Sequence, residues 1–291
     1  MPNMELDDDP SPLNLEQLLS SPSEDDASQD IPRHEDVNED CIPIKLVELL
    51  AAVPEDDPFM RKIQQKPCLP RLGGEPFTVQ SIPGKGMGVI ASRRIPRGSI
   101  ILNDPFVISI QEPTEDPFPK YDTNGLLSQV LFQVLNQYVQ LPMDTREQYA
   151  SLHPHVEPGS REWFQEQLRH AGVELTEDEL YFAVRLYYTF NTNEFSKLEP
   201  GRGRLWTVRR LFLLTARINH SCCPNARSRQ TTDGYKVITA IRNIEEGEEV
   251  TLKYLDHTRF SREGWRATTQ HTWGFVCACE GCRVKSEEYS N

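Results

Sequence analysis

The sequence has no run of 18 apolar residues, so it predicts no membrane-spanning helix. Its first ten residues, MPNMELDDDP, are acidic and precede no apolar stretch, which does not match a secretory signal. No five consecutive basic residues occur, so a nuclear import signal of that kind is not predicted. We therefore expect a reducing compartment, the nucleus or the cytoplasm, where clustered thiols among the seven cysteines indicate metal more often than disulfides.

Basic charge is scarce at the start of the chain. The first 60 residues hold 17 acidic and 2 basic residues, a balance of −15, and the whole chain has −13, which leaves +2 for residues 61–291. A body this close to neutral has no field that would attract nucleic acid. The composition therefore does not favour a zinc-stapled nucleic-acid binder.

Large apolar residues are also few in the first 40 positions, which are rich in Asp, Glu, Ser and Pro. Such a segment buries too little apolar surface to offset the entropy lost on ordering, so we expect it to be disordered. Two roles fit this composition: a solubilising tail, or an acidic arm that docks on a basic partner.

Helical patterns occur in two regions. IPIKLVELLAAV (42–53) has apolar residues at near-helical spacing and predicts a short helix. From 124 to 190, apolar residues recur three and four positions apart, and Thr176 with Glu179 has the spacing of a capping box. We therefore expect a helical region in the middle of the chain.

Strand patterns lie on both sides of that helical region. Between 77 and 110, short runs rich in Val and Ile are separated by Gly and Pro, which predicts several strands joined by tight turns. GYKVITAIRNIEEGEEVTLKYL (234–255) alternates, turns at a Glu-Gly pair and alternates again. The expected fold class is α+β, mostly β at its ends with a helical insertion.

Three cysteines near the C-terminus, Cys277, Cys279 and Cys282, form a C-x-C-x-x-C array. A structural zinc ion takes four such ligands, so one is missing. Either Cys222 or Cys223, which are adjacent in the polar stretch RINHSCCPNA, can supply it and join the array to a loop about 55 residues upstream. The alternative is three reduced thiols that hold no metal.

Four separated motifs resemble those of SET-domain proteins and occur in the order of that family. GKGMGV (84–89) resembles the first glycine-rich turn, and FNTNEFS (190–196) resembles the Asn-x-Phe segment before the catalytic half. RINHSCCPN (217–225) resembles the Asn-His-Ser-Cys signature, and GEEVTLKYLD (247–256) resembles the signature that ends in the family's tyrosine. The cysteine array then resembles a post-SET segment.

The resemblance is strongest to the split-SET group, in which a MYND zinc finger interrupts the domain. Residues 111–186 contain no cysteine and the chain ends soon after the array, so we expect both that finger and the group's helical C-terminal domain to be absent. The resemblance implies a mostly-β SET fold of short strands and small sheets at 71–258, with a helical insertion at about 111–190. We expect a zinc-binding post-SET segment at 259–291 and an acidic, largely disordered segment at 1–70.

The same resemblance implies transfer of a methyl group from S-adenosylmethionine to a lysine of a protein substrate, such as a histone tail or a non-histone protein. We expect a monomer that binds neither membranes nor nucleic acid directly. The residues implied at the cofactor are Lys85, Gly86, Met87, Asn193, Asn219, His220, Tyr254 and Phe275. Those implied at the lysine channel are Phe195, Tyr254 and Trp273. The implied zinc ligands are Cys222, Cys277, Cys279 and Cys282, which leaves Cys223 free.

Tyr254 is the expected catalytic residue, although alone it would be taken for an ordinary strand aromatic. The attacking lysine must be neutral, and with a free pKa near 10.4 only about one in a few thousand is neutral at pH 7, a deficit of about 4–5 kcal/mol. An apolar channel and the sulfonium charge lower that pKa, and the Tyr254 hydroxyl can orient the amine. The alternative is a catalytically silent SET-fold interaction module, against which the retained Tyr254, Asn219 and His220 argue.

Overall fold

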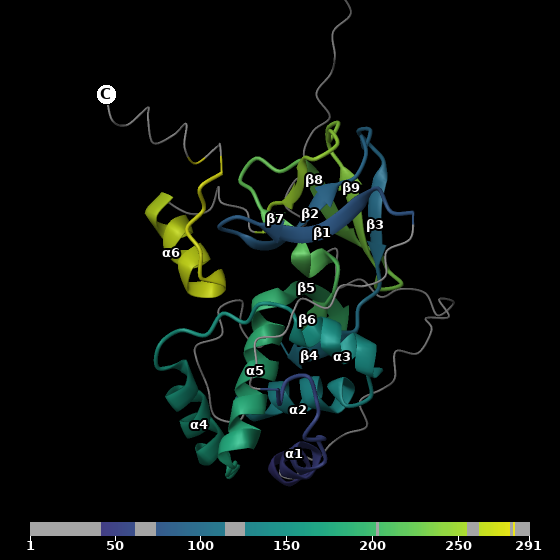
Figure 1. Ribbon diagram of the computed structural model, residues 1–291. Helices are drawn as coiled ribbons and strands as arrows, with labels where there is room; N and C mark the ends of the chain where they lie inside the picture. Colours follow the sequence, from purple (N-terminus) through teal and green to yellow (C-terminus); the bar gives the residue numbers. More distant parts are fainter. Residues whose placement is uncertain are drawn as a thin grey trace, which may run out of the picture.

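The computed structural model describes residues 42–61, 74–113, 126–201, 204–254, 262–279 and 282. Most helices gather at one end of the molecule and most strands at the other, with one small sheet between them, whereas the C-terminal helix lies beside the strand end (Figure 1). The fold class is α+β with small sheets, as the sequence predicts. Residues 1–40, which we expect to be disordered, lie outside the described residues.

The described strands form three small sheets. In spatial order the first holds β1 (Phe77–Ile82), β2 (Gly86–Ala91), β10 (Glu249–Leu252) and β7 (Asn219–His220). The second holds β3 (Ile100–Asp104), β9 (Lys236–Ala240) and β8 (Ala226–Gln230). The third holds β4 (Ile108–Pro113), β6 (Arg204–Leu211) and β5 (Glu194–Gly201).

The first sheet brings three of the sequence motifs together. Strand β10 pairs with β2 in antiparallel fashion, with Val250 opposite Val89. On its other side it pairs in parallel with β7, with Leu252 opposite His220. The glycine-rich turn, the polar Asn-His-Ser-Cys loop and the segment that ends in Tyr254 therefore emerge at one place, although up to about 165 residues separate them in the chain.

The predicted helices are present. They are α1 (Ile42–Ala51), α2 (Leu126–Tyr138), α3 (Met143–Ala150), α4 (Ser160–His170) and α5 (Glu177–Asn193). The structure also has a 3₁₀ turn (Thr215–Arg217) and helix α6 (Arg262–Trp273), which were not predicted. Helix α5 begins at the predicted capping box. The Thr176 hydroxyl accepts from the Glu179 backbone N–H, and the Glu179 carboxylate accepts from the Thr176 N–H. Within the described residues no helix is both long and apolar enough to cross a membrane.

Helix α1 packs against α2 and α5, so residues 42–61 belong to the folded part of the chain. Its buried residues, Ile42, Leu46 and Leu50, recur every four positions and lie on one face. The turn after it buries Asp57, which accepts a 2.7 Å hydrogen bond from the Tyr138 hydroxyl. Each buried leucine stabilises the fold by about 2 kcal/mol, and this burial offsets the entropy lost when the helix becomes ordered. The average composition of residues 1–70 does not show this local apolar face.

Two buried apolar clusters correspond to the two ends of the molecule. The larger one lies among helices α1 to α5 and includes Ile108 and Ile110 of β4 and Leu211 of β6, so the third sheet packs on the helices. The smaller one fills the space among the strands of the other two sheets. The proposed site residues described below come mainly from the strand end.

Candidate functional site

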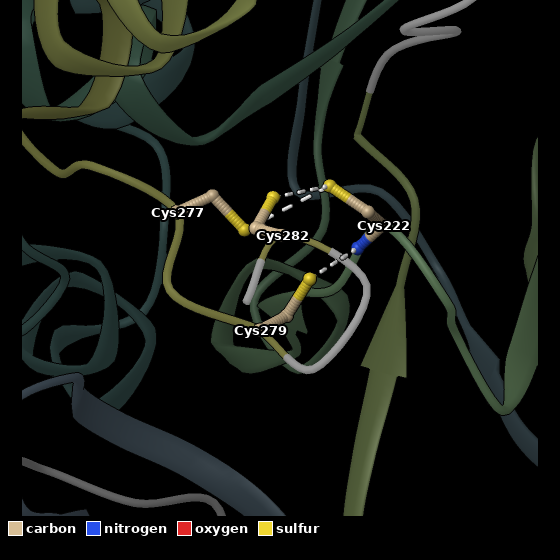
Figure 2. Close-up of side chains that lie close together, drawn as sticks. All are labelled: Cys222, Cys277, Cys279 and Cys282. Carbon is tan, nitrogen blue, oxygen red and sulfur yellow. Dashed lines mark hydrogen bonds between the residues drawn. The ribbon is translucent and has the colours of Figure 1, made fainter. Parts of the chain in front are cut away.

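Four cysteines from two distant segments converge. The Sγ atoms of Cys222, Cys277, Cys279 and Cys282 all lie within 4.8 Å of one another. The Cys222 Sγ is 3.8 Å from that of Cys277 and 3.4 Å from that of Cys282 (Figure 2). Cys223 is exposed and lies outside the cluster. The structure therefore places Cys222, and not its neighbour, beside the C-terminal array.

This cluster fits a tetrahedral metal ion. Four sulfur ligands at about 2.3 Å from a zinc ion are about 3.8 Å from one another, which is close to the observed spacing. Burial, together with the neighbouring thiols Cys279 and Cys282, raises the pKa of Cys277 to about 11, whereas Cys279, although partly buried, accepts backbone hydrogen bonds that lower its pKa to about 6. A cation among the four sulfurs would hold all of them as thiolates, and four thiolates are the ligand set of structural zinc sites.

Aromatic side chains pack beside the cysteines. The ring centroid of His220 is 5.3 Å from that of Tyr254, 5.0 Å from that of Trp265 and 6.1 Å from that of Phe275. Tyr254 is in turn 5.1 Å from Trp273. Trp265 and Trp273 belong to α6, and Phe275 precedes the array, so the segment anchored by the cysteines also completes this cluster.

Tyr254 is held at both its backbone and its hydroxyl. Its N–H donates to Nδ1 of His220 at 3.2 Å, and its hydroxyl donates to the carbonyl oxygen of Ile218 at 2.8 Å. Burial, with a smaller contribution from Glu249, raises the pKa of the Tyr254 phenol, so the hydroxyl stays protonated. Because the proton is directed to Ile218, the oxygen lone pairs remain available to accept a hydrogen bond.

The glycine-rich turn approaches Asn219 closely. A Cβ on Gly88 would lie 2.2 Å from Cδ1 of Ile82 and 2.8 Å from Nδ2 of Asn219, so only glycine fits there without a shift of these side chains. Nδ2 of Asn219 donates to the Met87 carbonyl at 3.2 Å and to the Glu249 carboxylate at 2.9 Å. Glu249 also pairs with Lys85. The amide orientation is thereby set, and Oδ1 of Asn219 has no hydrogen-bond partner among the described residues.

A sequence comparison decides the family. The family model described as the SET domain matches residues 86–255, which is more than half of the chain. This chain belongs to the SET-domain family.

Curated relatives of this SET domain match over shorter segments. Histone-lysine N-methyltransferase ATXR2 of Arabidopsis thaliana is 40% identical over 74 residues, which is 24% of this chain and 15% of that protein. SmydA-8 of Drosophila melanogaster, isoform B, is 32% identical over 113 residues, 38% of this chain and 25% of that protein. Human protein-lysine N-trimethyltransferase SMYD5 is 33% identical over 81 residues, 27% of this chain and 19% of that protein. The match thus spans a quarter or less of each of these relatives.

Among solved structures, the SET domain of LSMT bound to lysine and AdoHcy covers 81% of this chain. This chain covers 57% of that structure, at 15% identity and a TM-score of 0.38. The family assignment of this SET domain rests on the sequence match.

Asn193 and Phe195, which were predicted at the site, contact other parts of the fold. Asn193 ends α5, and its Nδ2 donates to the carbonyls of Thr189 at 2.8 Å and His153 at 2.9 Å. The Phe195 ring packs on Phe212 at 5.8 Å and not on the aromatic rings described around Tyr254. Their roles at the cofactor and the lysine channel stay predictions.

Sequence reasoning missed a contact between the helical insertion and the C-terminal segment of the SET domain. Gly274, between Trp273 and Phe275, has a φ of +74°, and a Cβ there would lie 2.4 Å from Nδ1 of His155. The His155 backbone N–H donates to the Thr192 hydroxyl at 2.9 Å. The loop around His155 therefore supports the turn that carries Trp273 and Phe275, and the sequence signal was the glycine between two aromatic residues.

Sequence reasoning also missed Lys236, a buried lysine. Its Nζ lies 4.4 Å from the centroid of the Phe195 ring and 5.6 Å from that of Phe212. Burial lowers its pKa from 10.5 to about 8. The signal was a lysine in register with Ile238 and Ala240 on the inward face of an alternating strand.

We expect Lys236→Met to stabilise the fold by about 2 kcal/mol at pH 7, since it removes a desolvated charge and forgoes a smaller cation–π attraction. Below about pH 8 Lys236 is charged in both the folded and the unfolded chain, and its buried ammonium destabilises the fold by the full amount. Between pH 8 and 10.5 the unfolded chain binds more protons than the folded one, so this destabilisation disappears as the pH rises. The gain should therefore shrink between pH 8 and 10. Urea unfolding across that range measures it. The exposed Lys45→Met on α1 is the control, and a gain that persists at pH 10 would contradict the assignment.

Proposed function

We propose that this SET domain transfers a methyl group from S-adenosylmethionine to the side-chain amine of a lysine in a protein substrate. The observation that carries the proposal is the convergence of Tyr254, Asn219 and the Gly88 turn with the aromatic segment that the cysteines anchor. Gly88 lies on β2, Tyr254 follows β10 and Asn219 lies on β7, three strands that are neighbours in one sheet. ATXR2 and SMYD5 are named as lysine methyltransferases, which supports the same chemistry here.

Asn219, the glycine-rich turn and Phe275 would hold the cofactor. The Oδ1 of Asn219 is a hydrogen-bond acceptor that suits an ammonium or an adenine amine, and the absence of a Cβ at Gly88 lets the Asn219 side chain lie against that strand. Exposed Lys85, at the turn, offers a cation for a carboxylate. S-adenosylmethionine supplies, when bound, a methyl group on a positively charged sulfur.

The Tyr254 side chain would position the substrate amine. Its lone pairs can accept an N–H of the amine, while its bond to the Ile218 carbonyl prevents the hydroxyl from turning away. The rings of Trp273 and Phe275 exclude water and favour a cation without a hydrogen bond. Holding amine and methyl in line supplies the proximity contribution, and desolvation favours the neutral amine.

The substrate would be a protein with an accessible lysine, either a histone tail or a non-histone protein. The relatives' names support histone and other protein lysines alike. We further propose that the domain acts as a monomer in the nucleus or cytoplasm, without binding nucleic acid. Zinc is the ion that we propose for the four cysteines.

Two measurements test the proposed function. Calorimetry of the purified full chain should show binding of S-adenosylmethionine and of its demethylated product. Radiolabelled methyl transfer to histones and to cell lysates should then give lysine-methylated products that mass spectrometry can locate. Binding without transfer to any substrate would support the alternative, a silent SET-fold interaction module, and no binding of either compound would remove the proposal.

We expect Gly88→Ala to weaken binding of S-adenosylmethionine by about 10-fold, because the new methyl group displaces both the Ile82 side chain and the Asn219 amide at a cost of about 1–3 kcal/mol. Calorimetry gives the Kd. Gly98→Ala is the matched control. Gly98 has a φ of +85° and nothing within 4 Å of an added Cβ, so that change should reduce stability and leave the Kd unaltered. Equal effects of both variants on the Kd would refute the contact.

A further inference from the structure

His220 lies between the cysteine cluster and Tyr254. It is on β7 and only 7% exposed. Its Nδ1 is 3.2 Å from the Tyr254 backbone nitrogen, and its Nε2 is 3.4 Å from the Cys222 Sγ. The two nitrogens of one imidazole thus face the two parts of the site.

The hydrogen-bond network assigns the ring proton. A backbone N–H can only donate, so Nδ1 of His220 must accept the bond from Tyr254 and carries no proton. The proton of the neutral ring is then on Nε2, which donates to the Cys222 sulfur. When the cysteines hold a cation, this sulfur is a thiolate, and a donor to an ionised acceptor makes a stronger hydrogen bond than a neutral pair.

The surrounding rings prevent the imidazole from rotating. Trp265 of α6 lies 5.0 Å from it and Phe275 lies 6.1 Å from it, while Tyr254 covers a third side at 5.3 Å. Both hydrogen bonds of His220 are therefore kept at once. A shift of the Cys222 sulfur is transmitted through a rigid ring to the backbone of Tyr254.

We propose that His220 is a positioning residue that couples the metal centre to Tyr254: its Nε2–H orients the Cys222 sulfur toward the ion, and its Nδ1 fixes the Tyr254 backbone. The coupling to Tyr254 rests on the proposed function, whereas the coupling to Cys222 does not. Hydrogen-bond partners that orient a metal ligand typically alter metal affinity or activity by about 10–100-fold when they are removed.

Two substitutions separate the two bonds. In His220→Asn the amide oxygen can still accept from the Tyr254 N–H, but no donor reaches Cys222. In His220→Gln the amide nitrogen extends to where Nε2 was and can still donate to Cys222, while the acceptor for Tyr254 is lost. The neighbouring Cys223→Ser, an exposed position outside the cluster, is the control for a change in the same loop.

The experiment uses the full chain loaded with Co²⁺, whose sulfur-to-metal charge-transfer band reports on thiolate hydrogen bonding, and the zinc form challenged with a chelator. We expect His220→Asn to shift that band to lower energy and to release zinc about 10–100-fold faster, with His220→Gln and Cys223→Ser close to wild type. In methyl-transfer assays, His220→Gln should lower kcat by about 10-fold although its metal content is unchanged. Circular dichroism confirms that each variant folds.

An unchanged band and an unchanged zinc release rate in folded His220→Asn would overturn the bond to Cys222. A wild-type kcat in His220→Gln would overturn the bond to Tyr254. If the wild-type protein transfers no methyl group but the cobalt and zinc results follow expectation, the proposed function fails and the Cys222 coupling stands.

Discussion

Tyr254→Phe is expected to lower kcat for methyl transfer by about 10²–10³-fold while S-adenosylmethionine binds almost as tightly as before. The substitution removes one hydroxyl and leaves the ring, so the contacts with Trp273 at 5.1 Å and with Phe275 at 6.4 Å are retained. What is lost is the acceptor that orients the amine. Loss of an interaction that forms mainly as the amine reaches the methyl group lowers kcat more than it weakens binding of the substrate.

The state of the hydroxyl sharpens this prediction. Burial raises the pKa of Tyr254, so the phenol stays protonated and does not act as a base at pH 7–9. Activity should therefore rise with pH because the substrate lysine loses its proton, and the rise should keep its midpoint in Tyr254→Phe while its amplitude falls. Single-turnover kinetics with a methyl-accepting peptide measure both quantities.

The control for this change is Tyr235→Phe, which removes a hydroxyl from a tyrosine that is 37% exposed and distant in sequence from the motif. It should leave kcat unaltered. If Tyr254→Phe folds, binds cofactor and turns over at the wild-type rate, then Tyr254 is a packing residue and the catalytic assignment is wrong.

Local chemistry explains why much of the site could be predicted from the sequence. The cysteine array, Asn219 and Tyr254 carry distinctive side chains at short spacings. The structure places Asn219 and Tyr254 on or just after two paired strands, and the array beside Cys222 in the loop that follows β7. The helices were also predictable, because an apolar period of three to four residues is a local property and the Thr176 cap is a local bond. The cysteine spacing alone left the fourth ligand open between Cys222 and Cys223, the resemblance to SET-domain proteins implied Cys222, and the structure places Cys222 in the cluster.

Contacts between distant segments could not be predicted in this way. His155 and Gly274 are far apart in sequence, and no periodicity relates them. Strand register is similarly non-local: the parallel pairing of β7 with β10 places His220 opposite Leu252, and a shift by one residue would turn His220 to the other face. The burial of Lys236 depends on another non-local register, that of β9 with β3 and β8, so its lysine identity alone gave no warning.

Removal of the metal ion is expected to detach the C-terminal segment of the domain. Replacing Cys277 by Ser leaves three thiolates, and binding of structural zinc contributes about 10–16 kcal/mol in small zinc modules. The ion closes a loop of about 55 residues, worth a further 4 kcal/mol or so by chain entropy. We expect Cys277→Ser to lose about one zinc per chain by mass spectrometry, and chelation of the wild-type protein to have the same result.

The rest of the fold should survive this change. The two buried apolar clusters are built from residues that precede α6 in the chain. The far-ultraviolet circular dichroism signal should therefore keep most of its amplitude. Trp265 and Trp273 should become exposed, because they pack on His220 and Tyr254 only while the segment is anchored. A red shift of tryptophan fluorescence and rapid proteolysis between 255 and 275 would register this exposure.

Activity then distinguishes two roles for the ion. If zinc only stiffens the chain, the zinc-free domain should retain methyl transfer once temperature is lowered enough to favour order. If zinc completes the site, as the packing of Trp273 and Phe275 against Tyr254 indicates, transfer should fall by at least about 10²-fold at every temperature, because the channel wall is missing. Cys223→Ser, which lies outside the cluster, should keep both its zinc and its activity, so loss of either in that variant would mean that the cluster in solution uses the neighbouring thiol.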